Sequence, residues 1–256
     1  MSYFTWKAHQ IFYRQQGSGP LLLVLPGNTA TSTLHQGELA YFSDRYCTAS
    51  LDFLGTGQSD RVAEWSEHWW VDAADQAIHL VDHLEYSDCI LMGVSGGAAV
   101  ALLAAIHYPE RVKAVIADSC VERFTMKMAD RNVRQGRLQR TPEQVQFWQS
   151  AQGDDWEQVI DADTTMLLHF AEQGGDWFAG RLKEIRCPVL LSASRQDSFL
   201  PNVVRELAKM SAQIADSMVF INGSGEHPLM WSSPDDFRSI CDQFLSLVTD
   251  CSLNSL

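Results

Sequence analysis

Gly93-Val94-Ser95-Gly96-Gly97 is the stretch that decides the fold, because it matches the pattern G-x-S-x-G where an apolar run gives way to a helical one. Residues 89–94 are typical of a buried strand, and residues 98–107 are typical of a helix. So sharp a turn strains the backbone at the serine, and side chains two residues to either side would collide. The pattern in this context predicts a nucleophile, Ser95, on a strand–turn–helix elbow.

Two other interpretations of a glycine-rich turn compete with this one. A dinucleotide-binding turn requires G-x-G-x-x-G, whereas residues 93–98 read G-V-S-G-G-A and residues 55–60 read G-T-G-Q-S-D, without the third glycine. A tight turn that only packs a helix on a strand remains the structural alternative. The match to the whole pattern between a strand and a helix favours the nucleophile.

Apolar runs and helical patterns alternate on both sides of the elbow. The apolar runs lie at residues 21–25, 47–53, 112–117, 189–191 and 218–221. Helical spacing of apolar residues fills the gaps, most clearly over residues 70–84 and 237–248. Continuous apolar runs suit strands that are buried on both faces, as in a parallel sheet. The sequence therefore predicts an α/β fold, a mostly parallel sheet flanked by helices, with an N-terminal hairpin over residues 4–15.

The alternation stops between residues 122 and 182. This stretch carries helical patterns at residues 145–150, 156–161 and 165–173, but no convincing strand. We therefore expect a core formed by residues 1–121 and 183–256. Residues 122–182 are expected to form a helical cap insertion over one end of the sheet.

Composition narrows the classes of partner. The chain has 256 residues, 46% of them hydrophobic, and a formal net charge of −13, so one core domain with an insertion fits its length. Nucleic acids and anionic membranes require basic patches, so neither is an expected partner. A small-molecule substrate is expected instead, and the sequence leaves the oligomeric state open.

Cysteine usage and the N-terminal residues bear on metals and on location. The six cysteines form no C-x-x-C pair, so no metal site is expected. Residues 1–14 lack the basic and apolar regions of a secretion signal, and no apolar run is long enough to span a bilayer. A cytoplasmic location is therefore the expectation.

With these motifs, the chain resembles the α/β-hydrolase superfamily over essentially its whole length. The family order of nucleophile, acid and histidine is met by Ser95, Asp197 and His227. Asp197 follows the strand at residues 189–191, and His227 follows the strand that ends at residue 221. The carboxyl ends of parallel strands converge on one crevice. There the histidine can exchange a proton with the serine while the carboxylate orients the ring.

The acid and the histidine each have rivals in the sequence. Some family members take the acid from the earlier strand, which makes Asp118 the alternative to Asp197. We prefer Asp197 because its loop resembles the usual acid loop of the family, whereas Asp118 leads straight into the insertion. A surface or packing role is expected for the remaining histidines, which are His9, His35, His68, His79, His83, His107 and His169.

The resemblance also implies an oxyanion loop and a structural loop. The oxyanion loop of the family normally reads His-Gly, and here Pro26-Gly27-Asn28 takes its place. Since the donors are backbone N–H groups, those of Asn28 and Gly96 are expected to form the oxyanion hole. Residues 52–60 look like the family's D-x-x-G-x-G-x-S loop, for which we expect a structural role.

Aromatic side chains of the insertion and of the acid loop are the candidates for substrate binding. Trp148 and Trp177 in the insertion, together with Phe199, could line an apolar pocket. The alternative is that such residues pack the insertion onto the core.

The resemblance implies a serine hydrolase that cleaves a small-molecule carboxylic ester through an acyl-enzyme on Ser95, with no cofactor and no metal. Thioester or carbon–carbon bond hydrolysis stays open. Haloalkane dehalogenase chemistry is disfavoured, because that branch has an aspartate where Ser95 stands. The alternative from another class is a slow or non-catalytic small-molecule sensor on a hydrolase scaffold. An intact set of Ser95, Asp197 and His227 favours the enzyme.

Overall fold

A single sheet of eight strands runs through the molecule, which the computed structural model describes over residues 2–253, with side chains for residues 2–248. Its strands are β1 (Ser2–Trp6), β2 (His9–Gln16), β3 (Leu21–Leu25), β4 (Cys47–Leu51), β5 (Cys89–Val94), β6 (Val112–Asp118), β7 (Val189–Ser194) and β8 (Ser217–Asn222). The strand order is β1-β2-β4-β3-β5-β6-β7-β8. The pairs β1–β2 and β2–β4 are antiparallel, and every other pair is parallel. The predicted fold class and N-terminal hairpin are both confirmed.

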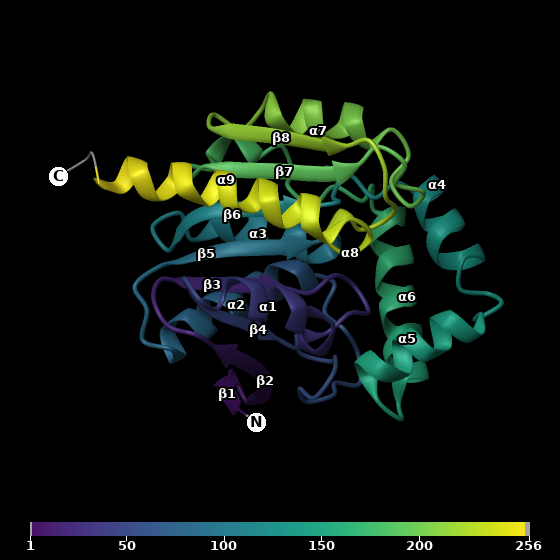
Figure 1. Ribbon diagram of the computed structural model, residues 1–256. Coiled ribbons are helices and arrows are strands. Elements are labelled where there is room, and N and C mark those ends of the chain that lie inside the picture. Colours follow the sequence, from purple (N-terminus) through teal and green to yellow (C-terminus); the bar gives the residue numbers. More distant parts are fainter. Residues whose placement is uncertain (1, 254–256) are drawn as a thin grey trace.

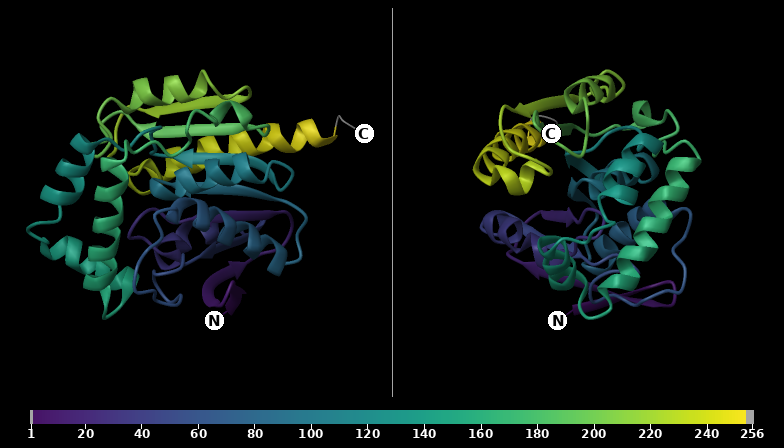
Figure 2. Two further views of the ribbon diagram at one scale, coloured as in Figure 1. Left: turned by 180° about the vertical axis from the view of Figure 1, so that it is seen from behind. Right: turned by 90° about the vertical axis from the view of Figure 1, so that its right-hand side faces the viewer.

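Helices cover both faces of the sheet (Figures 1 and 2). One face packs against α2 (Trp69–His83), α3 (Gly96–His107) and α7 (Val203–Ser211), and the other against α1 (Gln36–Phe42), α8 (Leu229–Ser232) and α9 (Pro234–Leu253). In β3, Leu21, Leu23 and Leu25 join the first cluster, whereas Leu22 and Val24 join the second. A strand buried on both faces needs apolar residues at every position, which explains the unbroken run Leu21–Leu25.

The helix α3 lies at the centre of the first layer. Every residue from Gly96 to Ile106 is buried, because α3 packs against β5, β6 and α2 at once. Its sequence is rich in glycine and alanine, so it can approach the sheet closely while remaining apolar on all sides. The elbow that precedes α3 is therefore held by a fully buried part of the core.

In the segment between β6 and β7, all helices but the last lie beyond the carboxyl ends of the strands (Figure 1), and the last, just before β7, lies beside α3. The segment contains α4 (Met126–Met128), the π-helical segment η2 (Ala129–Gln135), α5 (Pro142–Gln152), α6 (Trp156–Glu172) and the 3-10 helix η3 (Leu182–Glu184). Two of the predicted helical patterns merge into the single helix α6. A lone antiparallel bridge joins Arg123 to Asp176, and the division of the chain at residues 122 and 182 stays a prediction. Among residues 2–253, no helix is both long and apolar enough to cross a membrane.

Candidate active site

Ser95 lies on a strained turn between β5 and α3. Its backbone has φ 54° and ψ −120°, a conformation that residues other than glycine rarely adopt. A Cβ on Gly93 would lie 2.1 Å from the carbonyl oxygen of Gly97, and a Cβ on Gly97 would lie 2.2 Å from that of Leu25. Glycine is therefore required at both positions, as the sequence pattern predicts.

His227 connects Ser95 to Asp197. Its Nε2 lies 3.0 Å from Ser95 Oγ, and its Nδ1 lies 2.7 Å from Asp197 Oδ2. The other carboxylate oxygen, Asp197 Oδ1, accepts hydrogen bonds from the backbone N–H groups of Phe199 and Leu200 at 2.9 and 2.8 Å. The Asp197 side chain is fully buried. The two backbone hydrogen bonds to Oδ1 fix the carboxylate so that Oδ2 faces the imidazole.

Asp118, the alternative acid, is occupied elsewhere. Its Oδ1 accepts a hydrogen bond from Ser192 Oγ at 2.7 Å, and its Oδ2 accepts one from the backbone N–H of Met230 at 3.0 Å. Ser119 Oγ likewise accepts the N–H of Leu229 at 3.0 Å. Complete burial raises the pKa of Asp118 to about 6. Asp118 and Ser119 thus anchor the chain that follows His227, and no hydrogen bond between Asp118 and the His227 ring is found among the described residues.

The predicted oxyanion donors lie next to each other. A Cβ built on Gly96 would lie 3.3 Å from the backbone N of Asn28 and 1.8 Å from Asn28 Oδ1. The Asn28 side chain therefore fills the space that a side chain at position 96 would need. Gly96 opens α3, where N–H groups lack intrahelical partners and the helix dipole favours negative charge.

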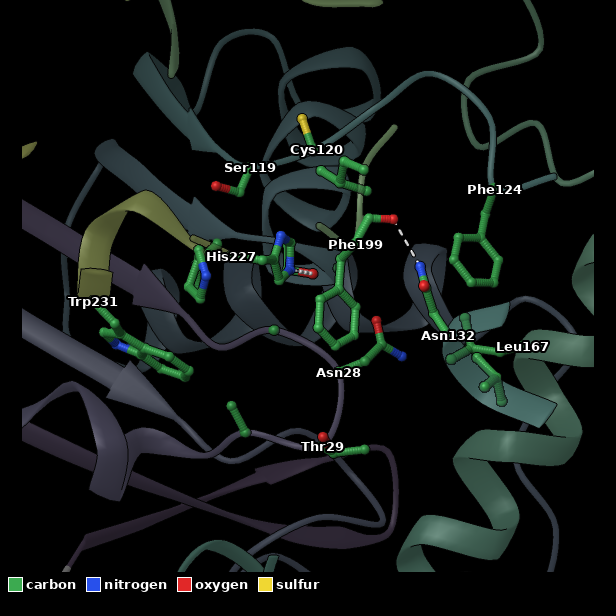
Figure 3. Close-up of a pocket in the computed structure, with 18 of the residues that line it drawn as sticks. Asn28, Thr29, Ser119, Cys120, Phe124, Asn132, Leu167, Phe199, His227 and Trp231 are labelled. Carbon is green, nitrogen blue, oxygen red and sulfur yellow. Dashed lines mark hydrogen bonds between the residues drawn. The ribbon is translucent and has the colours of Figure 1, made fainter. Parts of the chain in front are cut away.

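A cavity of about 460 Å³ opens beside the serine and the histidine. Ser95, His227, Asn28 and Gly96 all line it, and its walls come from the core and from the segment between β6 and β7 (Figure 3). Its apolar lining residues are Ala30, Val94, Val121, Phe124, Val133, Phe147, Trp148, Leu167, Trp177, Leu200, Phe199, Pro228 and Trp231. An acyl group of moderate size would fit in this space.

The three predicted substrate-binding residues line the cavity and also pack against other rings. Phe199 stacks on the His227 ring with a centroid distance of 5.1 Å, and it is 46% exposed (Figure 3). Trp148 stacks on Trp156 at 5.6 Å. Trp177 meets the rings of Trp70, Phe170 and Phe124. The two tryptophans therefore combine lining with packing, whereas Phe199 contributes little to the core.

Arg137 and Asp163 belong to the site but had no signal in the sequence. Asn28 Nδ2 donates to Asp163 Oδ1 at 2.6 Å, and Arg137 Nη2 lies 2.7 Å from Asp163 Oδ2. Asp163 belongs to α6 and Arg137 follows η2, so the chain of contacts joins the oxyanion loop to the helices above it. Only their meeting in three dimensions reveals a role, because neither residue lies in a recognisable motif of the sequence.

The loop at residues 52–60 is held by its own hydrogen bonds. The Asp52 carboxylate accepts the backbone N–H groups of Ser32 and Gln58, each at 2.8 Å. Ser59 Oγ accepts the N–H of Phe12 at 2.9 Å. A Cβ on Gly57 would lie 2.1 Å from Asp52 Oδ2. These contacts fix the chain next to the oxyanion loop, which is a structural role.

His35 lies behind the cavity wall and is fully buried. Neither ring nitrogen has a hydrogen-bond partner among the described residues, and the ring packs on Trp231 at a centroid distance of 5.4 Å. Burial lowers the pKa of His35 to about 3. His35 is therefore a neutral packing residue.

The arrangement can activate a hydroxyl nucleophile and stabilise an anion beside it. His227 can accept the Ser95 proton, and Asp197 can orient the ring. The backbone N–H groups of Asn28 and Gly96 lie close together beside the serine, as an oxyanion hole requires. Within residues 2–248, no group of three or more histidine, cysteine, aspartate or glutamate side chains is arranged to hold a metal ion.

A family model described as "Alpha/beta hydrolase family" matches residues 22–240. A 2-(acetamidomethylene)succinate hydrolase of Mesorhizobium japonicum is 36% identical over 104 residues, which are 41% of this chain and only 37% of that protein. An (E)-2-((N-methylformamido)methylene)succinate hydrolase of Acinetobacter baylyi is 25% identical over 91% of this chain and 93% of its own. The crystal structure of an E-2-(acetamidomethylene)succinate hydrolase superposes with a TM-score of 0.75 at 22% identity, covering 93% of this chain and 96% of the other.

Proposed function

Because the chain belongs to the alpha/beta hydrolase family, we propose that it is a serine hydrolase that cleaves small-molecule carboxylic esters through an acyl-enzyme on Ser95. The observation that carries the proposal is the continuous contact from Asp197 through His227 to Ser95, at 2.7 and 3.0 Å. Family membership alone would leave the activity open, since one fold hosts many functions.

The proposed reaction has two halves, with His227 active in both. His227 takes the proton of Ser95 Oγ as the oxygen attacks the ester carbonyl carbon, and the backbone N–H groups of Asn28 and Gly96 stabilise the tetrahedral oxyanion. His227 then gives this proton to the departing alcohol. In the second half, His227 takes a proton from water as the water attacks the acyl-enzyme, and Ser95 regains a proton when the acid leaves.

Related reactions share this first half, so the proposal names an ester as the simplest substrate. Thioesters would form the same acyl-enzyme, and carbon–carbon bond hydrolysis would require a substrate with a stabilised carbanion as leaving group. Two relatives are named for hydrolysis of succinate derivatives, which supports hydrolysis of a small molecule here. A sensor on this scaffold would bind its ligand with slow turnover or none.

The test is a panel of 4-nitrophenyl esters from acetate to decanoate. We expect saturable hydrolysis by the wild-type protein and a kcat lower by about 10³-fold or more in Ser95→Ala. Circular dichroism of the variant is the folding control. Equal activity of the two proteins would contradict the proposal, and ligand binding without turnover in the wild type would favour the sensor.

A further inference from the structure

The cavity beside Ser95 has one arginine in its lining, Arg137, among the residues that the structure describes. An exposed arginine in an active-site cavity would suit a substrate with a carboxylate, since guanidinium and carboxylate pair closely. The Arg137 side chain is only 14% exposed. The electrostatic effect of Arg137 on the cavity therefore depends on the charged group with which it pairs.

That charged group is Asp163, whose side chain is fully buried. Asp163 Oδ2 lies 2.7 Å from Arg137 Nη2, and Arg137 Nη1 donates to Thr164 Oγ1 at 2.6 Å. Asp163 Oδ1 accepts the amide N–H of Asn28 at 2.6 Å. The carboxylate has a partner for each oxygen, and both terminal nitrogens of the arginine are bonded to residues of α6.

The polar amides of the cavity are occupied in the same way. Asn132 Nδ2 donates to the carbonyl oxygen of Phe199 at 2.7 Å (Figure 3). Gln144 Nε2 donates to the carbonyl oxygen of Gly136 at 2.9 Å, and Gln144 Oε1 accepts the N–H of Thr141 at 3.0 Å. These bonds leave a largely apolar wall.

We infer that the cavity takes an uncharged acyl group, and that Asp163 sets this specificity by neutralising Arg137. This inference rests on the proposed ester hydrolysis. A carboxylate on the substrate would lose its hydration on entering the cavity and would meet an arginine already paired with a buried anion. Glu143, another lining residue, adds a further negative charge.

The test compares two esters of one chain length, 4-nitrophenyl valerate and mono(4-nitrophenyl) glutarate, which differ by a terminal carboxylate. We expect kcat/KM to favour the valerate by about 100-fold or more in the wild type, after subtraction of spontaneous hydrolysis. The ratio is measured on one protein sample, so a partly inactive preparation leaves it unchanged.

Of the two variants of the ion pair, only the one that removes the aspartate should weaken the preference for the valerate. Asp163→Asn frees the Arg137 charge, so the preference should fall by about 10-fold or more, through faster glutarate hydrolysis. Arg137→Met leaves Asp163 unpaired, so the preference should stay or rise. Asp161→Asn is the matched control, because Asp161 lies on the same helix but pairs with Arg140 at the surface. Its ratio should equal that of the wild type.

Equal or faster hydrolysis of the glutarate by the wild type would overturn the inference, as would an unchanged ratio in Asp163→Asn. The unreactive amides valeranilide and glutaranilic acid measure the same preference without turnover, through the fluorescence of the cavity tryptophans. Stronger binding of valeranilide supports the inference even if neither ester is cleaved, and stronger binding of glutaranilic acid overturns it. Absence of ester cleavage counts against the proposed function alone.

Discussion

Two buried aspartates lie at the carboxyl ends of neighbouring strands, Asp118 as the last residue of β6 and Asp197 after β7, and their hydrogen bonds give them different roles. Asp197 keeps one oxygen for the His227 ring and uses the other for the backbone of its own loop. Asp118 uses its oxygens for Ser192 and for the backbone of Met230. Asp197 is therefore placed to orient the imidazole, and Asp118 to hold the loop that carries it.

Replacing each aspartate by asparagine separates these roles. Asp197→Asn should lower kcat by about 10²-fold or more, because the histidine then populates the wrong tautomer. Asp118→Asn should lower kcat by less than about 10-fold, since its contacts reach His227 only through the backbone. The measurement is kcat on one activated ester, with circular dichroism as the folding control. A larger loss in Asp118→Asn at equal foldedness would place the acid at residue 118.

The sequence predicted the residues whose local context is distinctive. Ser95 lies in a five-residue pattern, and Asp197 and His227 each follow a strand that can be recognised from its apolar run. Arg137 and Asp163 could not be predicted, because their roles depend on how η2 and α6 meet above Asn28. A charged residue outside any recognisable motif is usually a solvated one.

The segment η2, the helices α5 and α6 and the acid loop supply much of the cavity wall. Their aromatic residues differ in how much each contributes to packing. Trp148 is 4% exposed and stacks on Trp156, whereas Phe199 is 46% exposed and stacks on the catalytic candidate His227. The helical patterns in the sequence predicted α5 and α6 in outline, but not α4 or η2. The joining of two patterns into α6 was not predicted, since residues 162–164 between them include a charged and a polar side chain that interrupt the apolar period.

Alanine substitutions should separate packing from catalysis in these elements. Trp148→Ala should lower the free energy of unfolding by about 3 kcal/mol, because it empties a buried ring position. Phe199→Ala should change that free energy by less than about 1 kcal/mol and shift the chain-length preference for esters. Denaturant unfolding and the ester panel measure the two effects. An unchanged chain-length profile in Phe199→Ala would show that its ring does not contact the acyl group.

The whole molecule carries a formal net charge of −13 and buries a neutral histidine in the core near its active site. Burial lowers the pKa of His35 to about 3, below its usual value in the unfolded chain. At pH values between these two pKa values, His35 is therefore protonated in the unfolded state but neutral in the folded state. The stability that His35 contributes is complete above about pH 6.5 and is lost as the pH falls toward 3.

His35→Phe should remove this acid sensitivity. Between pH 7 and pH 5, the wild type should lose about 2 kcal/mol more of its free energy of unfolding than the variant loses. Asp118, with a pKa raised to about 6, changes stability in the opposite direction, but it is present in both proteins and cancels. Urea unfolding at the two pH values is the measurement. Equal losses would mean that His35 is protonated in the folded protein.

The central claim is that Ser95 is a nucleophile activated by His227, and covalent labelling tests it most directly. A fluorophosphonate probe should react with the wild-type protein and leave its phosphonate on Ser95, identified by peptide mass spectrometry. His227→Ala, with its fold checked by circular dichroism, should be labelled at least about 10³-fold more slowly, because the serine hydroxyl then lacks its base. An adduct on a different serine, or labelling of Ser95 at the same rate without His227, would contradict the account.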